Sequence, residues 1–141
     1  MEAFIGKYER VSKENYSNTM RQLGVGRFLR FFSWLSEPVE EISFNSEENI
    51  WTIERRNLFS RHRVSFSLNK EFDETTADGR QVRTLVTFRD GKIFMRHNTK
   101  ISNLKNTRSI RELNSSGKEM TYTHIIEITN TTSVQKFERY R

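Results

Sequence analysis

The side chains that could perform catalysis or bind a metal are present in this sequence, but their spacing favours neither chemistry. The three histidines, His62, His97 and His124, lie on different expected strands with no acidic residue at ligand spacing. No serine, lysine or pair of carboxylates stands in a recognisable catalytic motif. Residues 24–26 lack the later glycine of a phosphate-binding loop. We therefore expect no enzymatic activity, no cofactor and no metal, and we interpret His124 as an interior histidine.

The composition favours a hollow protein with a partly polar interior. Hydrophobic residues make up 34% of the 141 positions and charged residues 30%, yet 11 phenylalanines are present. A wall of strands around a water-containing space uses such a mixture better than a dry core does, because interior positions need not all be apolar. The length corresponds to one domain, which we place at residues 1–141.

The sequence also constrains the compartment and the partners. It contains no cysteine, which excludes disulfides and suits a reducing compartment. It has neither a basic and apolar leader at its start nor an apolar run of about 20 residues, so we expect cytoplasmic residence. The net charge is +6, but apart from 54–56 and 61–63 the basic residues are scattered among acids. This pattern indicates a surface of mixed charge and no nucleic-acid partner.

One stretch near the start has helical periodicity. Between residues 15 and 35, apolar side chains recur at helical spacing on both sides of the glycines at 24–26, which predicts two short helices joined by a hinge. The first stripe contains Tyr16, Met20 and Leu23, and the second contains Phe28, Phe31, Phe32 and Leu35. Pro38 then ends the helical segment.

The remainder of the chain has the pattern of short strands. The expected strands cover residues 4–11, 39–44, 50–54, 58–68, 81–88, 92–97, 107–113, 119–129 and 133–140. Turn residues separate them, and Asp90-Gly91 is a two-residue hairpin signal. Such a succession predicts an antiparallel meander, and closure into a barrel would remove its exposed edges. The helical pair after the first strand would lie across one open end as a lid.

Several segments, in this order, resemble the intracellular fatty-acid-binding protein family, which includes the cellular retinoid carriers. They are Phe4-x-Gly6-x-Tyr8 followed by Ser12, Glu14, Asn15 and Tyr16, the turn at 23–26, Pro38, and above all residues 66–86 around 71–80. The resemblance runs from residue 4 to about residue 113, and more loosely beyond. It implies an all-β, lipocalin-like fold: a ten-stranded antiparallel up-and-down barrel with a helix-turn-helix lid at about 15–36 and one lipid inside.

The resemblance also implies where the lipid head group binds. Members of the family commonly hold a carboxylate with an arginine of the eighth strand, and residues 109–112 resemble that pattern, which makes Arg111 the inward cation. A guanidinium can hold a carboxylate with two hydrogen bonds, and such a pair is strong in a low-dielectric cavity. Strict alternation offers another interpretation, in which Ile110 points inward and Arg111 faces solvent.

The last strand departs from the family pattern. The family's Arg-x-Tyr aligns with Gln135 and Phe137, so we expect Gln135 beside Arg111 at the head group and Phe137 in the cavity. A rival register places Tyr140 at the tyrosine and Glu138 at the arginine. The departure leaves two ligands open: a long-chain fatty acid, or a neutral lipid such as retinol or a monoacylglycerol.

The expected wall of the cavity and its portal follow from the same alignment. The residues are Tyr16, Met20, Phe28, Leu35, Phe59, Phe66, Phe72, Ala77, Asp78, Met95, Tyr122 and Phe137. In the strand from 119, the apolar positions from Met120 to Ile128 alternate with more polar ones, which predicts a face that lines the cavity. Segments 98–106 and 120–132 run longer than the family pattern, and we interpret them as lengthened hairpins.

Three arginines, Arg21, Arg27 and Arg30, gather in the expected lid. They either make the surface of the helices soluble or dock the protein on anionic membranes during lipid transfer. Delivery of the lipid to a nuclear receptor is a further hypothesis, with the nucleus as a second compartment. Because small monomeric carriers dominate the family, we expect a monomer.

Overall fold

The computed structural model describes residues 1–27, 37–101 and 105–140. Within them the chain forms ten strands, one α-helix and one short 3-10 helix. In chain order these are η1 (Glu2–Phe4), β1 (Gly6–Glu14), α1 (Tyr16–Gln22), β2 (Val39–Asn45), β3 (Ile50–Arg56), β4 (Arg61–Phe66), β5 (Phe72–Thr75), β6 (Gln81–Arg89), β7 (Lys92–Thr99), β8 (Thr107–Leu113), β9 (Glu119–Ile126) and β10 (Thr131–Arg139).

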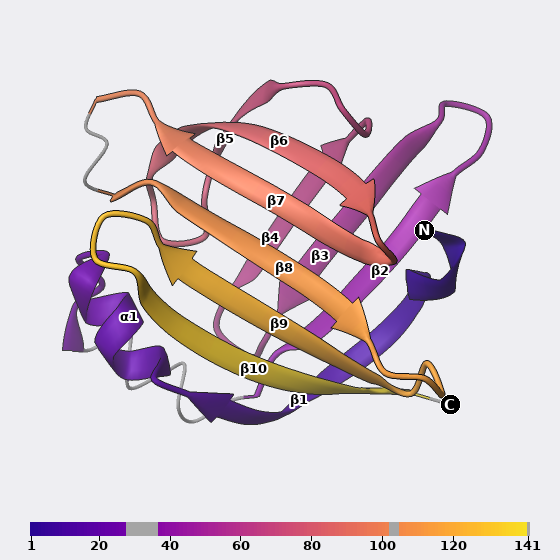
Figure 1. The fold of residues 1–141 in the computed structure, drawn as a ribbon, viewed down its shortest axis with the longest axis horizontal. Coiled ribbons are helices and arrows are strands. Elements are labelled where there is room, and N and C mark those ends of the chain that lie inside the picture. Colours follow the sequence, from indigo (N-terminus) through magenta and orange to yellow (C-terminus); the bar gives the residue numbers. More distant parts are fainter. Residues whose placement is uncertain (28–36, 102–104, 141) are drawn as a thin grey trace.

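The ten strands belong to one antiparallel sheet in the order β4-β3-β2-β1-β10-β9-β8-β7-β6-β5. Sequence neighbours pair with each other, and β1 pairs with β10, so the sheet curls into a nearly closed barrel (Figure 1). β4 and β5 stand at the two ends of this order, and among the described strands no hydrogen-bonded ladder joins them. The predicted ten-stranded barrel with a helix after its first strand is confirmed.

Local turn chemistry explains several of the strand ends. Asp90 and Gly91 have φ angles of 51° and 73°, the conformation that a two-residue hairpin requires, and they join β6 to β7 as predicted. Asn57 accepts hydrogen bonds from the amides of Phe59 and Ser60, so the segment before Arg61 is a turn and β4 starts later than predicted. Asn130, with φ of 55°, lies in the turn after Ile126, so β9 ends earlier than predicted.

One strand was not predicted from the alternation of apolar residues. β5 has only four residues, and two of them are acidic. Its burial pattern alternates weakly, and Phe72 is the only large apolar side chain that it contributes. The strand exists because it pairs with β6, from Phe72 opposite Thr84 to Thr75 opposite Gln81, and this pairing is a tertiary effect that local propensity does not contain.

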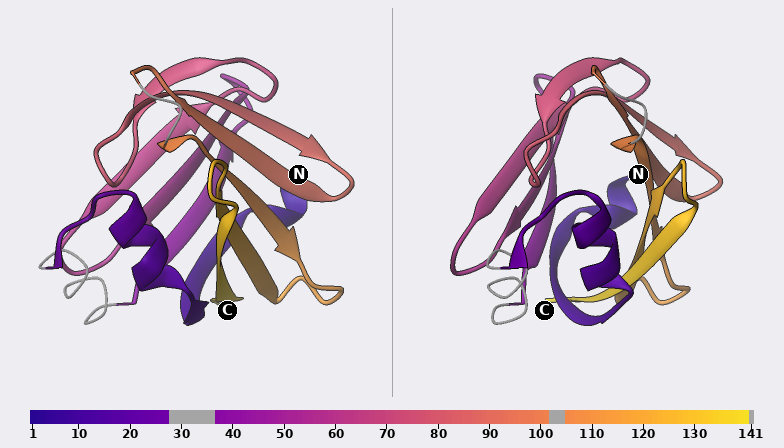
Figure 2. Two further views of the ribbon diagram at one scale, coloured as in Figure 1. Left: turned by 60° about the vertical axis from the view of Figure 1, so that its left-hand side comes forward. Right: turned by 90° about the vertical axis from the view of Figure 1, so that its left-hand side faces the viewer.

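The helix α1 lies across one end of the barrel, where Figure 2 shows it beside β10. The Gln22 side chain accepts hydrogen bonds from the hydroxyls of Thr129 and Thr131, and the Lys105 ammonium donates to the carbonyl of Leu23. The predicted second helix falls largely on residues 28–36, which lie outside the described residues. In the part of the chain that is described, no helix is long and apolar enough to cross a membrane.

The opposite end of the barrel is filled by an apolar core. The short helix η1 lies there (Figure 1), and the Tyr8 hydroxyl donates a 2.7 Å hydrogen bond to the Phe4 carbonyl. The buried members of the core are Phe4, Tyr8, Ile42, Trp51, Ile53, Val64, Phe66, Val86, Ile93, Met95, Met120 and Phe137. Ile53, Val64 and Met95 form the boundary of this core, because they also line the open space that extends from it toward α1.

Candidate functional site

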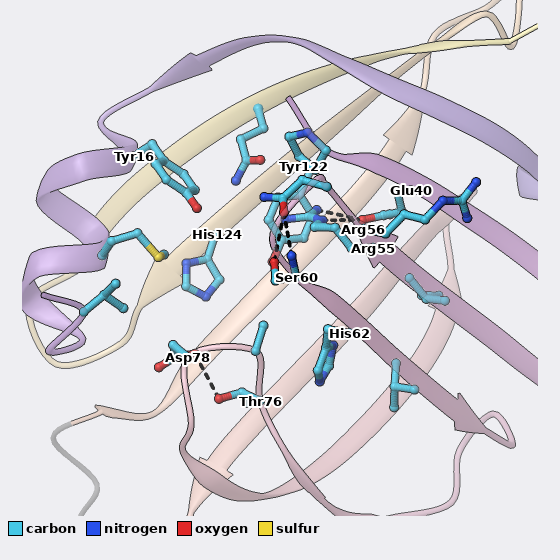
Figure 3. A pocket seen from close by; sticks show the side chains of 18 of the residues that line it. Tyr16, Glu40, Arg55, Arg56, Ser60, His62, Thr76, Asp78, Tyr122 and His124 are labelled. Atoms are coloured by element: carbon cyan, nitrogen blue, oxygen red, sulfur yellow. Dashed lines mark hydrogen bonds and ion pairs between the residues drawn. The ribbon is translucent and has the colours of Figure 1, made fainter. Parts of the chain in front are cut away.

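A cavity of about 590 Å³ occupies the space between the core and the helix (Figure 3). This volume lies within the range of about 300 to 1,000 Å³ that is typical of small-molecule sites. Of the residues expected at the head group and along the wall, nine line it: Tyr16, Met20, Phe59, Ala77, Asp78, Met95, Arg111, Tyr122 and Gln135.

The other expected wall residues lie elsewhere. Phe66, Phe72 and Phe137 belong to the packed end or pack against it rather than lining the cavity, because inward side chains from facing strands meet there and fill the space. Tyr140 is 44% exposed and lies beyond β10, away from the cavity. Ile128 is 55% exposed in the turn after β9, so the predicted apolar face ends at Ile126. Phe28 and Leu35 lie outside the described residues.

A buried ionic cluster of Glu40, Arg55 and Arg111 lies at the inner end of the cavity. Arg111 on β8 reaches across the barrel and donates from Nε to Glu40 Oε1 at 2.6 Å and from Nη2 to Oε2 at 3.2 Å. Arg55, the register partner of Glu40 on the neighbouring strand, donates to Oε2 from Nη2 at 2.7 Å and from Nε at 3.0 Å. Glu40 is fully buried and Arg111 is 5% exposed, so Arg111 faces inward.

The cluster carries one more positive charge than negative charge. Burial alone would raise the pKa of Glu40, but the charges of Arg111 and Arg55 and their hydrogen bonds outweigh burial and hold its pKa at about 2. Glu40 is therefore ionised at neutral pH beside two guanidinium groups. Among the described residues, Nη1 of Arg111 is buried and has no hydrogen-bond partner.

Aromatic rings support the two guanidinium groups. The ring of Tyr122 lies 4.8 Å from Cζ of Arg55 and 4.6 Å from Cζ of Arg111. The ring of Phe137 lies 5.1 Å from Cζ of Arg55. Such stacking stabilises a cation away from water. The rings of Tyr122 and Phe137 therefore help to fix the positions of the two arginines.

A second arginine contact holds Gln135. Nη1 of Arg10 on β1 donates to Oε1 of Gln135 at 3.1 Å, and both residues are 2% exposed. Nε of Arg10 donates to Glu37 at 2.6 Å, and its guanidinium lies 5.0 Å from the ring of Tyr16. Gln135 therefore lines the same cavity as Arg111 but hydrogen bonds to Arg10.

The outer part of the cavity is also polar. Arg80 donates from Nε to Asp78 at 2.6 Å. His97 Nε2 lies 3.5 Å from Glu74 Oε2, and His62 Nε2 lies 3.9 Å from Glu74 Oε1. The structure thus gives two of the histidines an acidic neighbour that sequence spacing did not predict. No group of three or more metal-ligating side chains within the described ranges could hold a metal ion.

His124 is an interior histidine, as its sequence position indicated. It is 6% exposed, and its ring stacks on that of Tyr122 with centroids 6.1 Å apart. Burial, with a smaller contribution from the charge of Arg80, lowers the pKa of His124 to about 3. The ring is therefore neutral at physiological pH.

Sequence reasoning missed Arg10, Glu40 and Arg55. A signal for each was present, because inward positions alternate along a strand. Tyr8 predicts an inward Arg10, Ile42 predicts an inward Glu40, and Ile53 predicts an inward Arg55. The general rule that charged residues are rarely buried masked these signals.

The comparisons with known proteins agree with this architecture. A sequence model of the lipocalin / cytosolic fatty-acid binding protein family matches residues 5–139. The chain is 37% identical over 92 residues to fatty acid-binding protein homolog 5 of Caenorhabditis elegans, which covers 65% of this chain and 66% of that protein. It is 39% identical over 93 residues to fatty acid-binding protein 9 of Mus musculus, which covers 66% and 69%.

Solved structures share the fold over almost the whole chain. Lipid binding protein 8 of Caenorhabditis elegans, in its apo form, superposes with a TM-score of 0.90 at 24% identity, over 99% of this chain and 97% of that one. The fatty acid-binding protein from brain tissue of Drosophila melanogaster superposes with a TM-score of 0.83 at 29% identity, over 96% and 98%. The chain belongs to the lipocalin / cytosolic fatty-acid binding protein family.

Proposed function

We propose that this protein is a non-enzymatic carrier of a long-chain fatty acid, which it binds without a covalent bond in the cavity and transfers between membranes or partners. The observation that carries the proposal is the ionic cluster, which has an excess positive charge at the inner end of the cavity. A buried excess charge is costly unless an anion compensates it. A ligand carboxylate would supply that anion. Relatives named as fatty acid-binding proteins support the same ligand class.

The proposed contacts follow from the geometry of the cluster. The ligand carboxylate accepts a hydrogen bond from the unpaired Nη1 of Arg111 and lies beside the guanidinium of Arg55. Glu40 keeps its hydrogen bonds to both arginines. The acyl chain contacts Ile53, Val64 and Met95 on the cavity wall. Each buried methylene contributes about 0.8 kcal/mol before ordering costs.

A neutral lipid is the second candidate, and Glu40 is the observation that favours it. Glu40 already occupies Nε and Nη2 of Arg111, the edge that a carboxylate would use for two parallel hydrogen bonds. A hydroxyl head group, such as that of retinol or a monoacylglycerol, would need no compensating charge. At the ionic cluster the two candidates differ in the charge of the head group.

Titration of the wild-type protein with stearic acid and with the matched alcohol distinguishes the candidates. We expect the acid to bind at least about tenfold more tightly, because only the acid neutralises the excess charge of the cluster. Isothermal calorimetry would measure both affinities, and native mass spectrometry would identify the lipid that co-purifies. Tighter binding of the alcohol would support the neutral-lipid candidate, and absence of binding by either would overturn the carrier proposal.

The lid supplies a testable route for lipid transfer in the cytoplasm. Arg21 and Arg27 are exposed at the end of the barrel that holds α1, while Arg30 lies outside the described residues. We propose that they draw this end toward anionic membranes, since basic side chains are attracted to a negative surface potential within about one Debye length. Delivery to a nuclear receptor and a monomeric state stay predictions.

Reversing the charge of both residues tests the membrane contact. In Arg21→Glu/Arg27→Glu we expect transfer of a fluorescent fatty acid to phosphatidylserine vesicles to slow several-fold at low salt and to match the wild type at about 1 M salt. Arg108→Glu, an exposed residue on β8, is the control. Equal slowing by the control, or no dependence on anionic lipid, would leave the lid arginines with a solubilising role.

A further inference from the structure

Four large apolar side chains are strongly exposed in segments that join strands. Among the described residues, Ile101 is 94% exposed, Leu58 85%, Ile128 55% and Phe59 54%. A single exposed apolar side chain is common on a protein surface and needs no explanation. Several that share one end of a molecule indicate a surface that contacts a partner or a membrane.

These side chains lie at the end of the barrel that holds α1. Ile128 lies in the β9–β10 turn, which hydrogen bonds link to α1. Ile101 lies in the β7–β8 connection, and a hydrogen bond links that connection to the carbonyl that follows α1. Leu58 and Phe59 lie in the β3–β4 turn, and Phe59 lines the cavity together with side chains of α1. In the right-hand view of Figure 2 this end faces the viewer, with α1 in front.

The turns at the opposite end of the barrel have a different composition. Residues 46–49, 90–91 and 114–118 join β2 to β3, β6 to β7 and β8 to β9, and they contain only asparagine, aspartate, glutamate, serine, glycine and lysine. The fourth connection at that end contains Leu68, whose side chain packs against the core. Turns at both ends face water, so a general preference for polar turns does not explain the apolar side chains at the α1 end.

The segments that join strands at the two ends also differ in charge. At the α1 end the described residues of these segments, α1 included, carry five basic and three acidic side chains. They are Arg21, Arg27, Arg80, Lys100, Lys105, Glu37, Asp78 and Glu127. At the opposite end the segments carry two basic and four acidic side chains, which are Lys70, Lys118, Glu47, Glu48, Glu71 and Asp90. The α1 end is therefore both the more apolar and the more positive end.

This combination matches the surface of an anionic membrane. Each apolar side chain can enter the head-group region separately, while nearby basic side chains reach the phosphates because their long stems keep the charge in water. Arg61 lies two residues after Phe59 and Lys100 directly precedes Ile101, and both are exposed. A folded protein partner would need a continuous surface of roughly 800 Å². Isolated side chains on three separate turns favour lipid over such a partner.

We propose that the α1 end inserts Leu58, Ile101 and Ile128 into the head-group region of anionic membranes, and we call these three residues the apolar tips. The inference deepens the proposed function and rests on it, because it gives the transfer step a second source of membrane affinity beside the charges of Arg21 and Arg27. Phe59 is not counted as a tip because it lines the cavity. Its position next to Leu58 joins the inserted turn directly to the wall that contacts the lipid.

Salt separates the two sources of affinity. The attraction between basic side chains and anionic lipids is screened within about 3 Å at 1 M salt. Burial of apolar side chains is not weakened by salt in this way. Insertion of the apolar tips should therefore persist at a salt concentration that removes the contribution of the arginines.

A dye at each apolar tip tests insertion directly. The chain contains no cysteine, so a single introduced cysteine can carry an environment-sensitive dye. In the separate variants Leu58→Cys, Ile101→Cys and Ile128→Cys we expect the dye to brighten several-fold when vesicles of phosphatidylserine and phosphatidylcholine are added, because it leaves water. Lipids with a spin label on the acyl chain should quench it. Ile5→Cys is the matched control, an apolar residue that is 40% exposed at the opposite end.

Serine variants then measure the contribution of the tips to affinity. In Leu58→Ser/Ile101→Ser/Ile128→Ser we expect vesicle affinity, measured by co-sedimentation without fatty acid, to fall about tenfold at low salt and at about 1 M salt. Arg21→Glu/Arg27→Glu should lose affinity only at low salt. Ile5→Ser/Tyr140→Ser changes two exposed residues at the opposite end and should bind vesicles as the wild type does.

The outcomes separate this inference from the carrier proposal. Dyes at the apolar tips that do not respond to vesicles, or a triple serine variant that binds vesicles like the wild type, would overturn the inference and leave the tips to a protein partner. Equal brightening at position 5 would show adsorption without orientation and would overturn it as well. Because neither experiment contains fatty acid, these results leave the carrier proposal intact, and the titration with stearic acid tests that proposal on its own.

Discussion

Replacing Glu40 with glutamine should make the protein less stable and a stronger binder of carboxylates. In the wild type the folded-state pKa of Glu40 is about 2, below its ordinary value of 4.5. The ionised carboxylate therefore contributes about 3 kcal/mol to the free energy of unfolding at neutral pH. Glutamine would remove this contribution and raise the charge of the cluster, so fatty acids should bind at least about tenfold more tightly.

The pH dependence checks the sign of this effect. The stabilisation by Glu40 is fully present above its unfolded-state pKa of about 4.5 and is lost as the pH falls toward 2. Urea unfolding at several pH values should therefore show a difference between wild type and Glu40→Gln that shrinks toward zero in that window. A constant difference at all pH values would show that packing, and not charge, is responsible.

A matched glutamate controls for the substitution itself. Glu54 on β3 also accepts hydrogen bonds from two arginines, Arg56 and Arg61, but on the outer face of the barrel. The Glu54 side chain is only 11% exposed, but its partners Arg56 and Arg61 are 39% and 65% exposed, so water screens these ion pairs and they contribute little to stability. Glu54→Gln should therefore change neither the unfolding free energy appreciably nor the affinity for fatty acids. Gain of affinity in both variants would exclude a specific role for Glu40.

Replacing Arg111 with methionine should produce the largest loss of fatty acid binding. The substitution removes the unpaired Nη1 and leaves Glu40 with Arg55 alone, so the cluster loses its excess charge. Truncating one member of a buried charge pair costs roughly 2 to 5 kcal/mol, so the affinity for stearic acid should fall about 100-fold. The affinity for the matched alcohol should fall much less. Arg108→Met, exposed on the same strand, is the control.

The double variant separates the binding role of Arg111 from its structural role. Arg111→Met alone should also lower the unfolding free energy, because it removes two hydrogen bonds from a fully buried carboxylate. In Glu40→Gln/Arg111→Met that carboxylate is gone, so much of the stability should return while the affinity for stearic acid stays low. Recovery of both stability and affinity would show that Arg111 does not contact the ligand.

The fold was predictable because its signals are local. Asp90-Gly91 predicts a hairpin from the two residues themselves, and the alternation of apolar residues predicts most strands to within a few residues. β5 was missed because its four residues depend on pairing with β6 for their structure. The resemblance to a known family, rather than periodicity, supplied the tenth strand.

The candidate site was predictable only in part, because its central contacts join distant strands. Periodicity alone left the direction of Arg111 open, and the family resemblance favoured the inward position that the structure shows. Its partner Glu40 is 71 residues away in sequence, and no local pattern links the two. A buried glutamate can pair with any inward arginine, so the pairing follows from the curvature of the sheet, which brings β2 and β8 face to face, rather than from the sequence near either residue.

The pairing of β1 with β10 has a consequence for how the protein folds. Arg10 meets Gln135, a residue 125 positions later, and the carbonyl of Ala3 accepts a hydrogen bond from Arg139. During synthesis, the edge of β1 that pairs with β10 therefore stays unpaired until the end of the chain has been made. Proteins dominated by such non-local contacts fold slowly, because loop-closure entropy is lost before the contacts form. We therefore expect the barrel to reach its final shape late in folding, when the two ends of the chain meet.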